Sequence, residues 1–256
     1  MANDPAHELF QRYWRQYEAG GAAAYQVPYA EVVHHRLERL PRCLERVPLQ
    51  ARILDVGCAD GYMLYLLWQA GYRQLTGVDV SPEMVERARQ RLPAQVPIIQ
   101  ADLRDYLRTV PDGSHDLILL HHVLEHIPRE HTLEVLRHLH RLLAPGGLLN
   151  VRVPNACHLM AGYYLHGDFT HVVHYNERSL PQVLEAAGFE RERIEPMQRP
   201  PRLYWSWRRP HRALLRLFNR GRWHLHALLH RGLCALTDLR PAPQIFEVEL
   251  EVVAQR

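Results

Sequence analysis

The stretch that decides the fold reads RILDVGCADG over residues 52–61. Its first five residues form a short apolar run, and Gly57 and Gly61 follow in a loop that opens an apolar helical segment. Glycines let a backbone pass close to a ligand, and the N-terminus of the next helix offers unpaired N–H groups. The stretch therefore predicts a strand, a ligand-binding loop and a helix. A dinucleotide-binding fingerprint requires its third glycine at the position of Tyr62, so NAD and FAD are disfavoured.

Strand-length apolar runs alternate with helix-length amphipathic segments beyond this loop. We expect strands at 52–56, 74–80, 97–101, 115–120, 147–153, 190–196 and 245–253, and helices at 61–70, 82–92, 129–143 and 177–187. Strands that lack clean apolar-polar alternation and are separated by helices indicate a parallel sheet covered on both faces. The predicted fold class is α/β, with a doubly wound, mostly parallel seven-stranded sheet.

Local signals set the element boundaries. Ser81 followed by Pro82 is typical of a helix start, and Pro145, Gly146 and Gly147 are expected to end one helix and turn the chain into the next strand. We predict three parts, described by residue number. They are an N-terminal helical cover at 1–48, a core at 49–197 with 244–256, and an Arg-rich amphipathic helical insertion at 198–243.

Composition narrows the class of protein. The 256 residues are 47% hydrophobic and 23% charged, which is typical of a globular chain and excludes disorder. No apolar run approaches the roughly 18 residues of a membrane-spanning helix. The N-terminus lacks the order of a secretory signal, and the four cysteines form neither a C-x-x-C motif nor a zinc spacing. We expect a cytoplasmic protein, with the inner face of the membrane as an alternative location.

Further motifs follow the other predicted strands. Asp79 ends the second strand, Asp102 follows the third, and the fourth runs into HHVLEHI at 121–127. Residues 142–149, LLAPGGLL, form a helix-to-strand turn. With the glycine loop, these motifs resemble those of class I S-adenosylmethionine (SAM)-dependent methyltransferases across 52–153. The resemblance implies a Rossmann-like fold, methyl transfer and SAM as the cofactor.

The resemblance also implies which residues bind the cofactor. They are Asp55, Gly57, Cys58, Ala59, Gly61, Asp79, Val80, Met84, Asp102, Leu103 and His121. An acidic side chain such as Asp79 can accept two hydrogen bonds from a ribose diol. Asp102 has an alternative role, because Asp commonly caps the N-terminus of a helix. The sequence departs from the family at Ala59, which stands where the family has its second glycine.

Methyl transfer to an alcohol needs an aligned nucleophile and a base, and His is the usual base near neutral pH. The candidate catalytic residues are His171, His121 and Asp168. The stretch 168–189 resembles methyltransferases of bacterial glycan and sugar pathways, which implies a hydroxyl acceptor with His171 as base or positioning group. Alternatively, His171 and Asp168 only brace their loop. A metal site of Asp168, His171 and His174 is disfavoured, so no metal is predicted.

Two residues of the segment after the fourth strand, Glu125 and His126, are interpreted as local helix contacts rather than catalysts.

The basic residues are unevenly distributed. All 31 are Arg against 28 acidic residues, so the net charge is only +3 and nucleic acid is an improbable partner. Residues 191–240 nevertheless hold twelve Arg and three acidic residues. Two leucine-rich helical patterns, at 213–218 and 225–239, lie in this stretch with several Trp. Residues 202–240 could therefore lie on an anionic membrane beside a lipid-linked acceptor, or form a lid whose leucines pack on the domain.

Together these patterns predict a SAM-dependent methyltransferase that O-methylates a sugar, glycan or lipid-linked small molecule. One alternative is C- or N-methylation of a lipid-like or other small metabolite. A non-enzymatic alternative is a SAM-binding regulatory or membrane-tethering protein.

Overall fold

The structure is a computed structural model that describes residues 40–197, 210–237, 245 and 247–256. Most of the predicted N-terminal helical cover, 1–48, lies outside the described residues. Its last part contains a short 3-10 helix, η3 (Arg42–Arg46). Cys43 of this helix is buried in the hydrophobic core.

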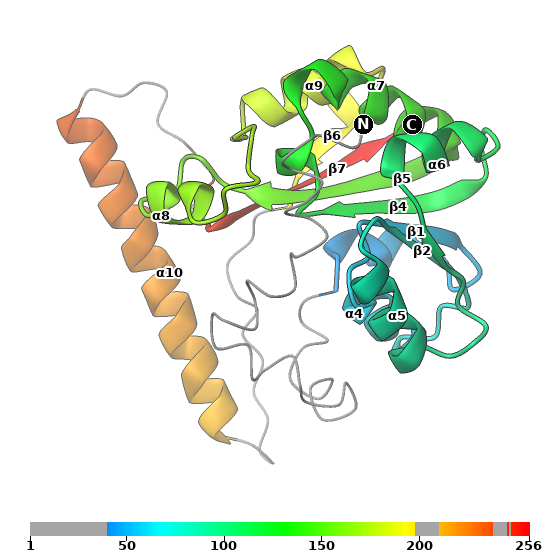
Figure 1. Cartoon of the computed structure of the whole chain (residues 1–256). Coiled ribbons are helices and arrows are strands. Elements are labelled where there is room, and N and C mark those ends of the chain that lie inside the picture. Colours follow the sequence, from blue (N-terminus) through cyan, green and yellow to red (C-terminus); the bar gives the residue numbers. More distant parts are fainter. Residues whose placement is uncertain (1–39, 198–209, 238–244, 246) are drawn as a thin grey trace.

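One sheet organises the described part of the chain (Figure 1). Its strands are β1 (Arg52–Val56), β2 (Gln74–Asp79), β3 (Ile98–Gln100), β4 (His115–His121), β5 (Leu143–Pro154), β6 (Ile194–Pro196) and β7 (Glu249–Gln255). They follow the order β3-β2-β1-β4-β5-β7-β6, in which β7 runs antiparallel to all the other strands. The predicted doubly wound, mostly parallel seven-stranded sheet is confirmed.

Helices cover both faces of this sheet. They are α4 (Tyr62–Gln69) and α5 (Pro82–Arg91) on one face, and α6 (Leu103–Thr109), α7 (Arg129–Leu142) and α9 (Ser179–Ala186) on the other (Figure 1). Side chains alternate across each strand, so Ile53 of β1 packs under the first pair while Leu54 packs under the second group. The strands are apolar on both faces for this reason, which is why they read as continuous apolar runs.

Several boundaries differ from the sequence expectation. Strand β5 begins at Leu143, directly after α7, so Pro145, Gly146 and Gly147 lie within the strand and the prediction of a turn there was wrong. The residues form an irregularity instead, because the pairing with β4 shifts between His115 and Leu117. Strand β6 is shorter than predicted, since residues 191–193 form a 3-10 turn, η5 (Arg191–Arg193). The short helices α6 and α8 (Ala161–His166) were not predicted.

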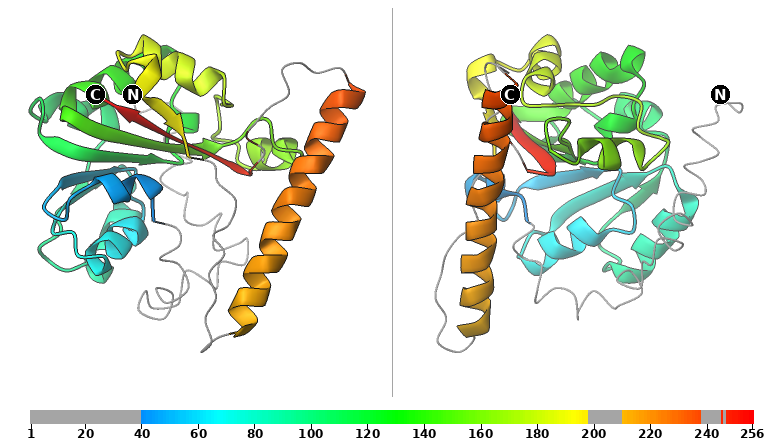
Figure 2. Two further views of the ribbon diagram at one scale, coloured as in Figure 1. Left: turned by 180° about the vertical axis from the view of Figure 1, so that it is seen from behind. Right: turned by 90° about the vertical axis from the view of Figure 1, so that its left-hand side faces the viewer.

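Within its described residues, 210–237, the predicted insertion holds one helix rather than two, α10 (Pro210–Leu236). No proline interrupts it, and Gly221 lies inside it in open space. Figure 2 shows α10 along one side of the α/β domain, outside both helical layers. His230 Nε2 lies 2.8 Å from the carbonyl oxygen of Cys157, and Trp223 donates to Glu247 at 3.0 Å. Within the described ranges, no helix has the length and hydropathy needed to cross a membrane.

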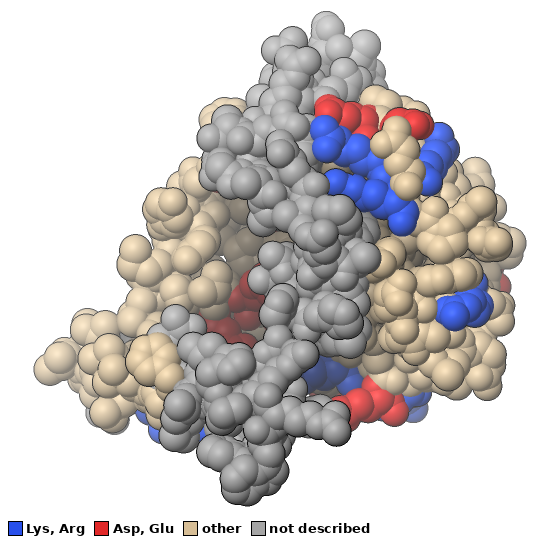
Figure 3. Space-filling model, turned by 90° about the horizontal axis from the view of Figure 1, so that it is seen from below, with Lys and Arg blue, Asp and Glu red and all other residues tan. Residues whose placement is uncertain are grey.

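The face of α10 that meets the domain is not the leucine-rich one. Ala227, His230 and Cys234 are buried. The exposed side is apolar and comprises Phe218, Leu225, Leu228, Leu229, Leu233 and Leu236. The alternative in which these leucines pack on the domain is therefore wrong for the described part of the chain. On the face drawn in Figure 3, basic side chains stand beside acidic ones and form no single basic surface among the described residues.

Candidate cofactor and acceptor site

The loop after β1 has the backbone that its glycines predicted. Gly57, Ala59 and Gly61 all have positive φ, at 69°, 45° and 80°. The amide of Gly57 donates to Val78 of β2 at 2.8 Å, which fixes the loop to the neighbouring strand. A Cβ added to Gly57 would lie 2.3 Å from Val123 Cγ2, so the loop also packs directly against the segment after β4. Only glycine fits at this position without displacing that side chain.

Two carboxylates lie beside the loop. Asp79 holds it by accepting hydrogen bonds from the amides of Ala59 at 2.8 Å and Ser81 at 2.9 Å. Asp55 is buried, and no described residue donates a hydrogen bond to its carboxylate. Burial, and then the charge of Asp79, raise the pKa of Asp55 to about 8, and burial raises the pKa of Asp79. A cation bound beside the two carboxylates would reduce the repulsion between them, so these residues fit a ligand that carries positive charge.

The remaining predicted cofactor residues lie at the same edge of the sheet. Cys58 turns inward, with its sulfur 2.8 Å from a Cβ added to Gly77, and burial raises the pKa of its thiol. Met84 is buried in the first turn of α5, while Val80 connects β2 to that helix. Asp102 caps α6 by accepting from the amide of Arg104 at 2.9 Å, which is the alternative role that sequence allowed. Leu103 begins α6 and packs partly on the core.

His121 ends β4 but belongs to a buried polar network. Its Nε2 lies 2.5 Å from Asn150 Oδ1, and Asn150 donates to Glu251 at 3.0 Å. Burial, and then the charge of Arg152, lower the pKa of His121 to about 3. The ring is therefore neutral, and because Asn150 Oδ1 only accepts, the proton sits on Nε2. A pKa lowered this far makes His121 a weak candidate base.

The predicted acceptor loop, residues 167–175, folds against the segment after β4. The amides of Val172 and Val173 donate to the Glu125 carbonyl at 2.9 and 3.1 Å. Asp168 accepts from the Thr170 hydroxyl at 2.6 Å and from its amide at 2.9 Å. These bonds outweigh the opposing effect of burial and lower the pKa of Asp168. Asp168 therefore holds Thr170 in place, as expected from the alternative in which it braces the loop.

Two histidines meet at this contact. The His126 and His171 ring centroids lie 4.7 Å apart. His126 Nδ1 is 2.9 Å from the Thr170 hydroxyl, and His171 Nδ1 is 3.1 Å from the carbonyl oxygen of Leu165. The predicted alternative grouping of His171 with His174 does not form, because the His174 ring lies against His166 instead. The sequence interpretation of Glu125 and His126 was a local helix contact, and their separations of 46 and 45 residues from His171 gave no local signal of this meeting.

The surface around this loop is apolar. Phe169 is 86% exposed and Tyr163 73% exposed, and Met160 and Val172 are also exposed. Large exposed apolar side chains grouped near a polar site are typical of a binding surface. They indicate an acceptor, or a surface carrying it, with an apolar part.

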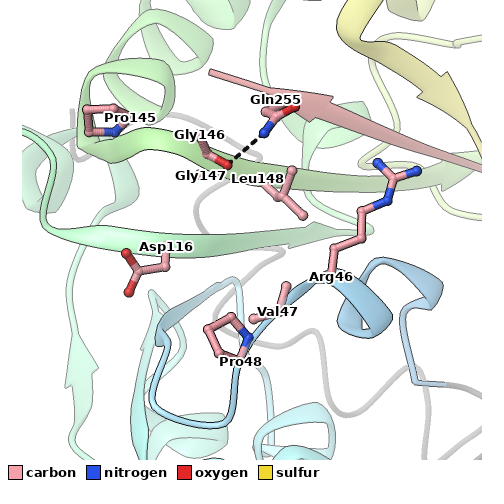
Figure 4. A pocket seen from close by; sticks show the side chains of 9 residues that line it. All are labelled: Arg46, Val47, Pro48, Asp116, Pro145, Gly146, Gly147, Leu148 and Gln255. Atoms are coloured by element: carbon pink, nitrogen blue, oxygen red, sulfur yellow. Dashed lines mark hydrogen bonds between the residues drawn. The ribbon is translucent and has the colours of Figure 1, made fainter.

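Two surface cavities lie at the other edge of the sheet. One of about 230 Å³ is lined by residues that start β4 and β5, among them Asp116 and Gly147, and Gln255 donates to the carbonyl oxygen of Gly146 beside it at 3.1 Å (Figure 4). A second, of about 390 Å³, lies near Ser114 and Thr76. Ligands of doubly wound sheets bind at the carboxyl ends of the strands. These cavities lie at the amino ends, so we assign them no part in the site.

Comparisons with known proteins agree with the fold and with the loop. Residues 25–193 match a family described as a methyltransferase domain. Trans-aconitate 2-methyltransferase of Azoarcus sp. (strain BH72) is 38% identical over 133 residues, which cover 49% of each chain. A probable S-adenosylmethionine-dependent methyltransferase of Mycolicibacterium smegmatis is 31% identical over 63% of this chain and 58% of the other. The chain thus spans about half the length of the curated relatives it matches.

Solved structures show the same fold at low identity. A SAM-dependent methyltransferase from Archaeoglobus fulgidus aligns with a TM-score of 0.59 at 20% identity, over 89% of this chain and 98% of that one. A possible histamine N-methyltransferase from Thermotoga maritima aligns with a TM-score of 0.61 at 15% identity, over 98% and 99% of the two chains.

Proposed function

The chain belongs to the methyltransferase domain family, and from that premise we propose that it transfers a methyl group from S-adenosyl-L-methionine, the cofactor of this family, to an oxygen atom of a small molecule. The observation that carries the proposal is the pair formed by buried Asp55 and half-buried Asp79 beside a positive-φ loop. When bound, the cofactor supplies an activated methyl group on a positively charged sulfur. The two carboxylates offer the negative charge that such a ligand requires.

In this proposal the loop and the carboxylates divide the work of binding. The glycine loop offers its backbone at the N-terminus of α4. Asp79 already accepts two amide hydrogen bonds, but each carboxylate oxygen keeps a further lone pair for the ribose hydroxyls. Asp55 lies deeper and provides charge. Gly57, Cys58, Ala59, Gly61, Val80, Met84, Asp102, Leu103 and His121 stay proposed contacts.

His171 is the proposed base or positioning group for the acceptor. Its Nδ1 can only donate to the Leu165 carbonyl, so in the neutral ring Nε2 is unprotonated and able to take a hydroxyl proton. A hydroxyl of a sugar, glycan or lipid-linked molecule is favoured over an anionic acceptor for an electrostatic reason. The carboxylate of Asp79 would repel an anion.

The names of the relatives favour a second acceptor class. Several are named trans-aconitate 2-methyltransferase, so a small carboxylic acid is the competing acceptor. The two classes are separated by incubating the full chain with methyl-labelled SAM and either trans-aconitate or pools of sugar nucleotides and glycolipids. Label in the sugar or lipid pool supports the proposal. Label in trans-aconitate alone overturns the hydroxyl acceptor, and failure to bind the demethylated cofactor overturns the enzyme itself.

The exposed leucines of α10 support contact with an anionic membrane that presents a lipid-linked acceptor. An amphipathic helix with an exposed apolar row, in a segment rich in Arg, has the properties of an interfacial helix. The test is co-sedimentation of the full chain with vesicles of anionic or neutral lipid, compared with the variant Leu225→Ser/Leu228→Ser/Leu229→Ser. Binding that is indifferent to anionic lipid, or to these substitutions, overturns the membrane contact.

A further inference from the structure

Three potential metal ligands converge where the acceptor loop meets the segment after β4. One ligand atom from each of Glu125, His126 and His171 can be chosen so that all three lie within 4.8 Å of one another. Two of these residues come from η4 (Leu124–His126) and its end, and the third comes from a loop 45 residues further along the chain. The fold, rather than a local motif, brings them together.

Glu125 is the member that needs explanation. Its side chain is 1% exposed, and within the described residues neither carboxylate oxygen accepts a hydrogen bond. His122 Nδ1 lies 3.4 Å from Oε1, an ion-pair distance beyond the usual length of an N–H···O hydrogen bond, and the other ring nitrogen, Nε2, lies 3.2 Å from Glu249. His122 is thus divided between two carboxylates, and the buried Glu125 carboxylate still lacks a hydrogen bond within the described residues, so a metal ion would compensate its charge further.

The hydrogen bonds of the two histidines fix which nitrogen carries the proton. Thr170 donates its hydroxyl hydrogen to Asp168 at 2.6 Å, so the same oxygen must accept from His126 Nδ1. His171 Nδ1 donates to the Leu165 carbonyl. In the neutral state both rings therefore carry the proton on Nδ1 and the lone pair on Nε2. Histidine ligands of metals are oriented by such outer hydrogen bonds.

We propose that Glu125, His126 and His171 bind a divalent transition-metal ion, of the class of zinc, manganese or cobalt. Two imidazoles and one carboxylate suit these ions, whereas magnesium prefers oxygen ligands alone. Tetrahedral zinc would hold such ligand atoms about 3.3 Å apart, so binding draws the three side chains slightly together. Three protein ligands leave a coordination position open for an acceptor oxygen.

The site lies next to the proposed cofactor site. Val123 touches Gly57 of the glycine loop, and Glu125 follows Val123 by two residues. A cation here would orient an acceptor oxygen and lower the pKa of its hydroxyl proton. His171, whose Nε2 would bind the ion, would then act as the positioning group rather than as the base. The functional role rests on the proposed function, but binding of the ion does not.

Cobalt binding to the full chain tests the inference directly. Protein treated with chelator and then titrated with Co²⁺ is followed by visible absorption, and bound metal is counted by elemental analysis. The variants are Glu125→Gln and His171→Asn, with His174→Asn as the matched control from the same loop. We expect one Co²⁺ per chain in the wild type and the control, and binding at least about 100-fold weaker in the two cluster variants.

Two further readouts keep the result decisive. Zn²⁺ should raise the thermal unfolding midpoint of the wild type and of His174→Asn but not of Glu125→Gln, whereas a purely structural Glu125 would shift the midpoint with or without metal. Should Glu125→Gln fail to fold, His171→Asn decides. Cobalt binding that is absent from the wild type, or that survives both cluster substitutions, overturns the inference.

Binding of the demethylated cofactor in the same samples separates the two proposals. Bound cobalt without cofactor binding rejects the proposed function and leaves the metal site. Cofactor binding with methyl transfer that is insensitive to chelation and to Glu125→Gln rejects the metal site and leaves the proposed function.

Discussion

The cofactor half of the site, residues 52–103, and the acceptor half, residues 121–126 with 161–175, are built in different ways. In the cofactor half the polar contacts are made by backbone and by carboxylates that directly follow strands, as where Asp79 holds Ala59. In the acceptor half, side chains depend on residues far along the sequence, as where Thr170 fixes His126. Site residues at strand ends can be predicted from the sequence. Site residues that a distant loop brings together can be recognised only in the folded structure.

A substitution in the acceptor half alone should have the largest effect on activity. We expect His171→Asn to lower turnover by about 10² to 10⁴-fold, because it removes a proton acceptor or metal ligand, while affinity for the demethylated cofactor stays within about twofold. Calorimetry and a methyl-transfer assay check the two parts, with His174→Asn as the control. Turnover equal to wild type would remove His171 from the mechanism.

A substitution in the glycine loop should disrupt the cofactor half. Gly57→Ala places a methyl group against Val123 at a φ of 69°, so we expect the free energy of unfolding to fall by about 2 to 3 kcal/mol and cofactor binding to be lost. Denaturant titration and calorimetry measure both. Gly162→Ala, where a Cβ meets nothing within 4 Å, should change stability by less than about 0.5 kcal/mol. Equal effects in the two variants would contradict this account of the loop.

The charge of Asp55 should make the affinity of the cofactor half for SAM depend on pH. With its pKa near 8 in the free protein, binding of a cationic cofactor releases a proton, so affinity for SAM should rise from pH 6 to pH 8 by up to about tenfold per pH unit. Asp55→Asn should flatten this rise in calorimetry. A wild-type affinity that does not change with pH would rule out ionised Asp55 as a cofactor partner.

The free energy of unfolding should depend on pH in the opposite direction to the affinity for SAM. The folded state raises the pKa of Asp55 above its ordinary value of 3.8, so the folded protein binds more protons than the unfolded chain between about pH 4 and pH 8. The contribution of Asp55 to the free energy of unfolding therefore falls as pH rises through this window. Denaturant titrations of wild type and Asp55→Asn should diverge towards pH 8, and curves that stay parallel would contradict the assignment.

The smallest effect is expected on α10, outside both halves. Leu228 is 68% exposed, so Leu228→Ser should change the free energy of unfolding by less than about 0.5 kcal/mol. By contrast, Leu136→Ala in α7, at 0% exposure, should cost about 2 to 5 kcal/mol. Denaturant titration of the two variants shows whether α10 is part of the core. A large loss at Leu228 would mean that its exposed row has a partner in solution.

The sequence was sufficient for the sheet and for the backbone of the loop after β1. Buried parallel strands are apolar on both faces, so β1, β2 and β4 could be located to within one residue. The start of β5 was missed because Pro145, Gly146 and Gly147 ordinarily mark a turn, and only the pairing of Leu143 with His115 makes them part of a strand. That pairing is a tertiary contact with no sequence signal.

The residues of the acceptor half could be predicted from the sequence only in part. His171 could be proposed from the chemistry of its residue type, but Glu125 and His126 looked like ordinary helix contacts. Their meeting with His171 depends on the amides of the returning loop that bond to the Glu125 carbonyl. Likewise, the leucine patterns at 213–218 and 225–239 were interpreted as two helices, but no proline separates them and the structure has one helix over Pro210–Leu236.

The position of β7 between β5 and β6 has a consequence for biosynthesis. Strand β6 pairs only with β7, which leaves the ribosome about fifty residues later. While the segment containing α10 is being translated, β6 has no neighbour and the outer edge of β5 is open. The nascent sheet therefore has to be protected from wrong pairing at that edge until β7 arrives, and the acceptor half cannot reach its final form before then.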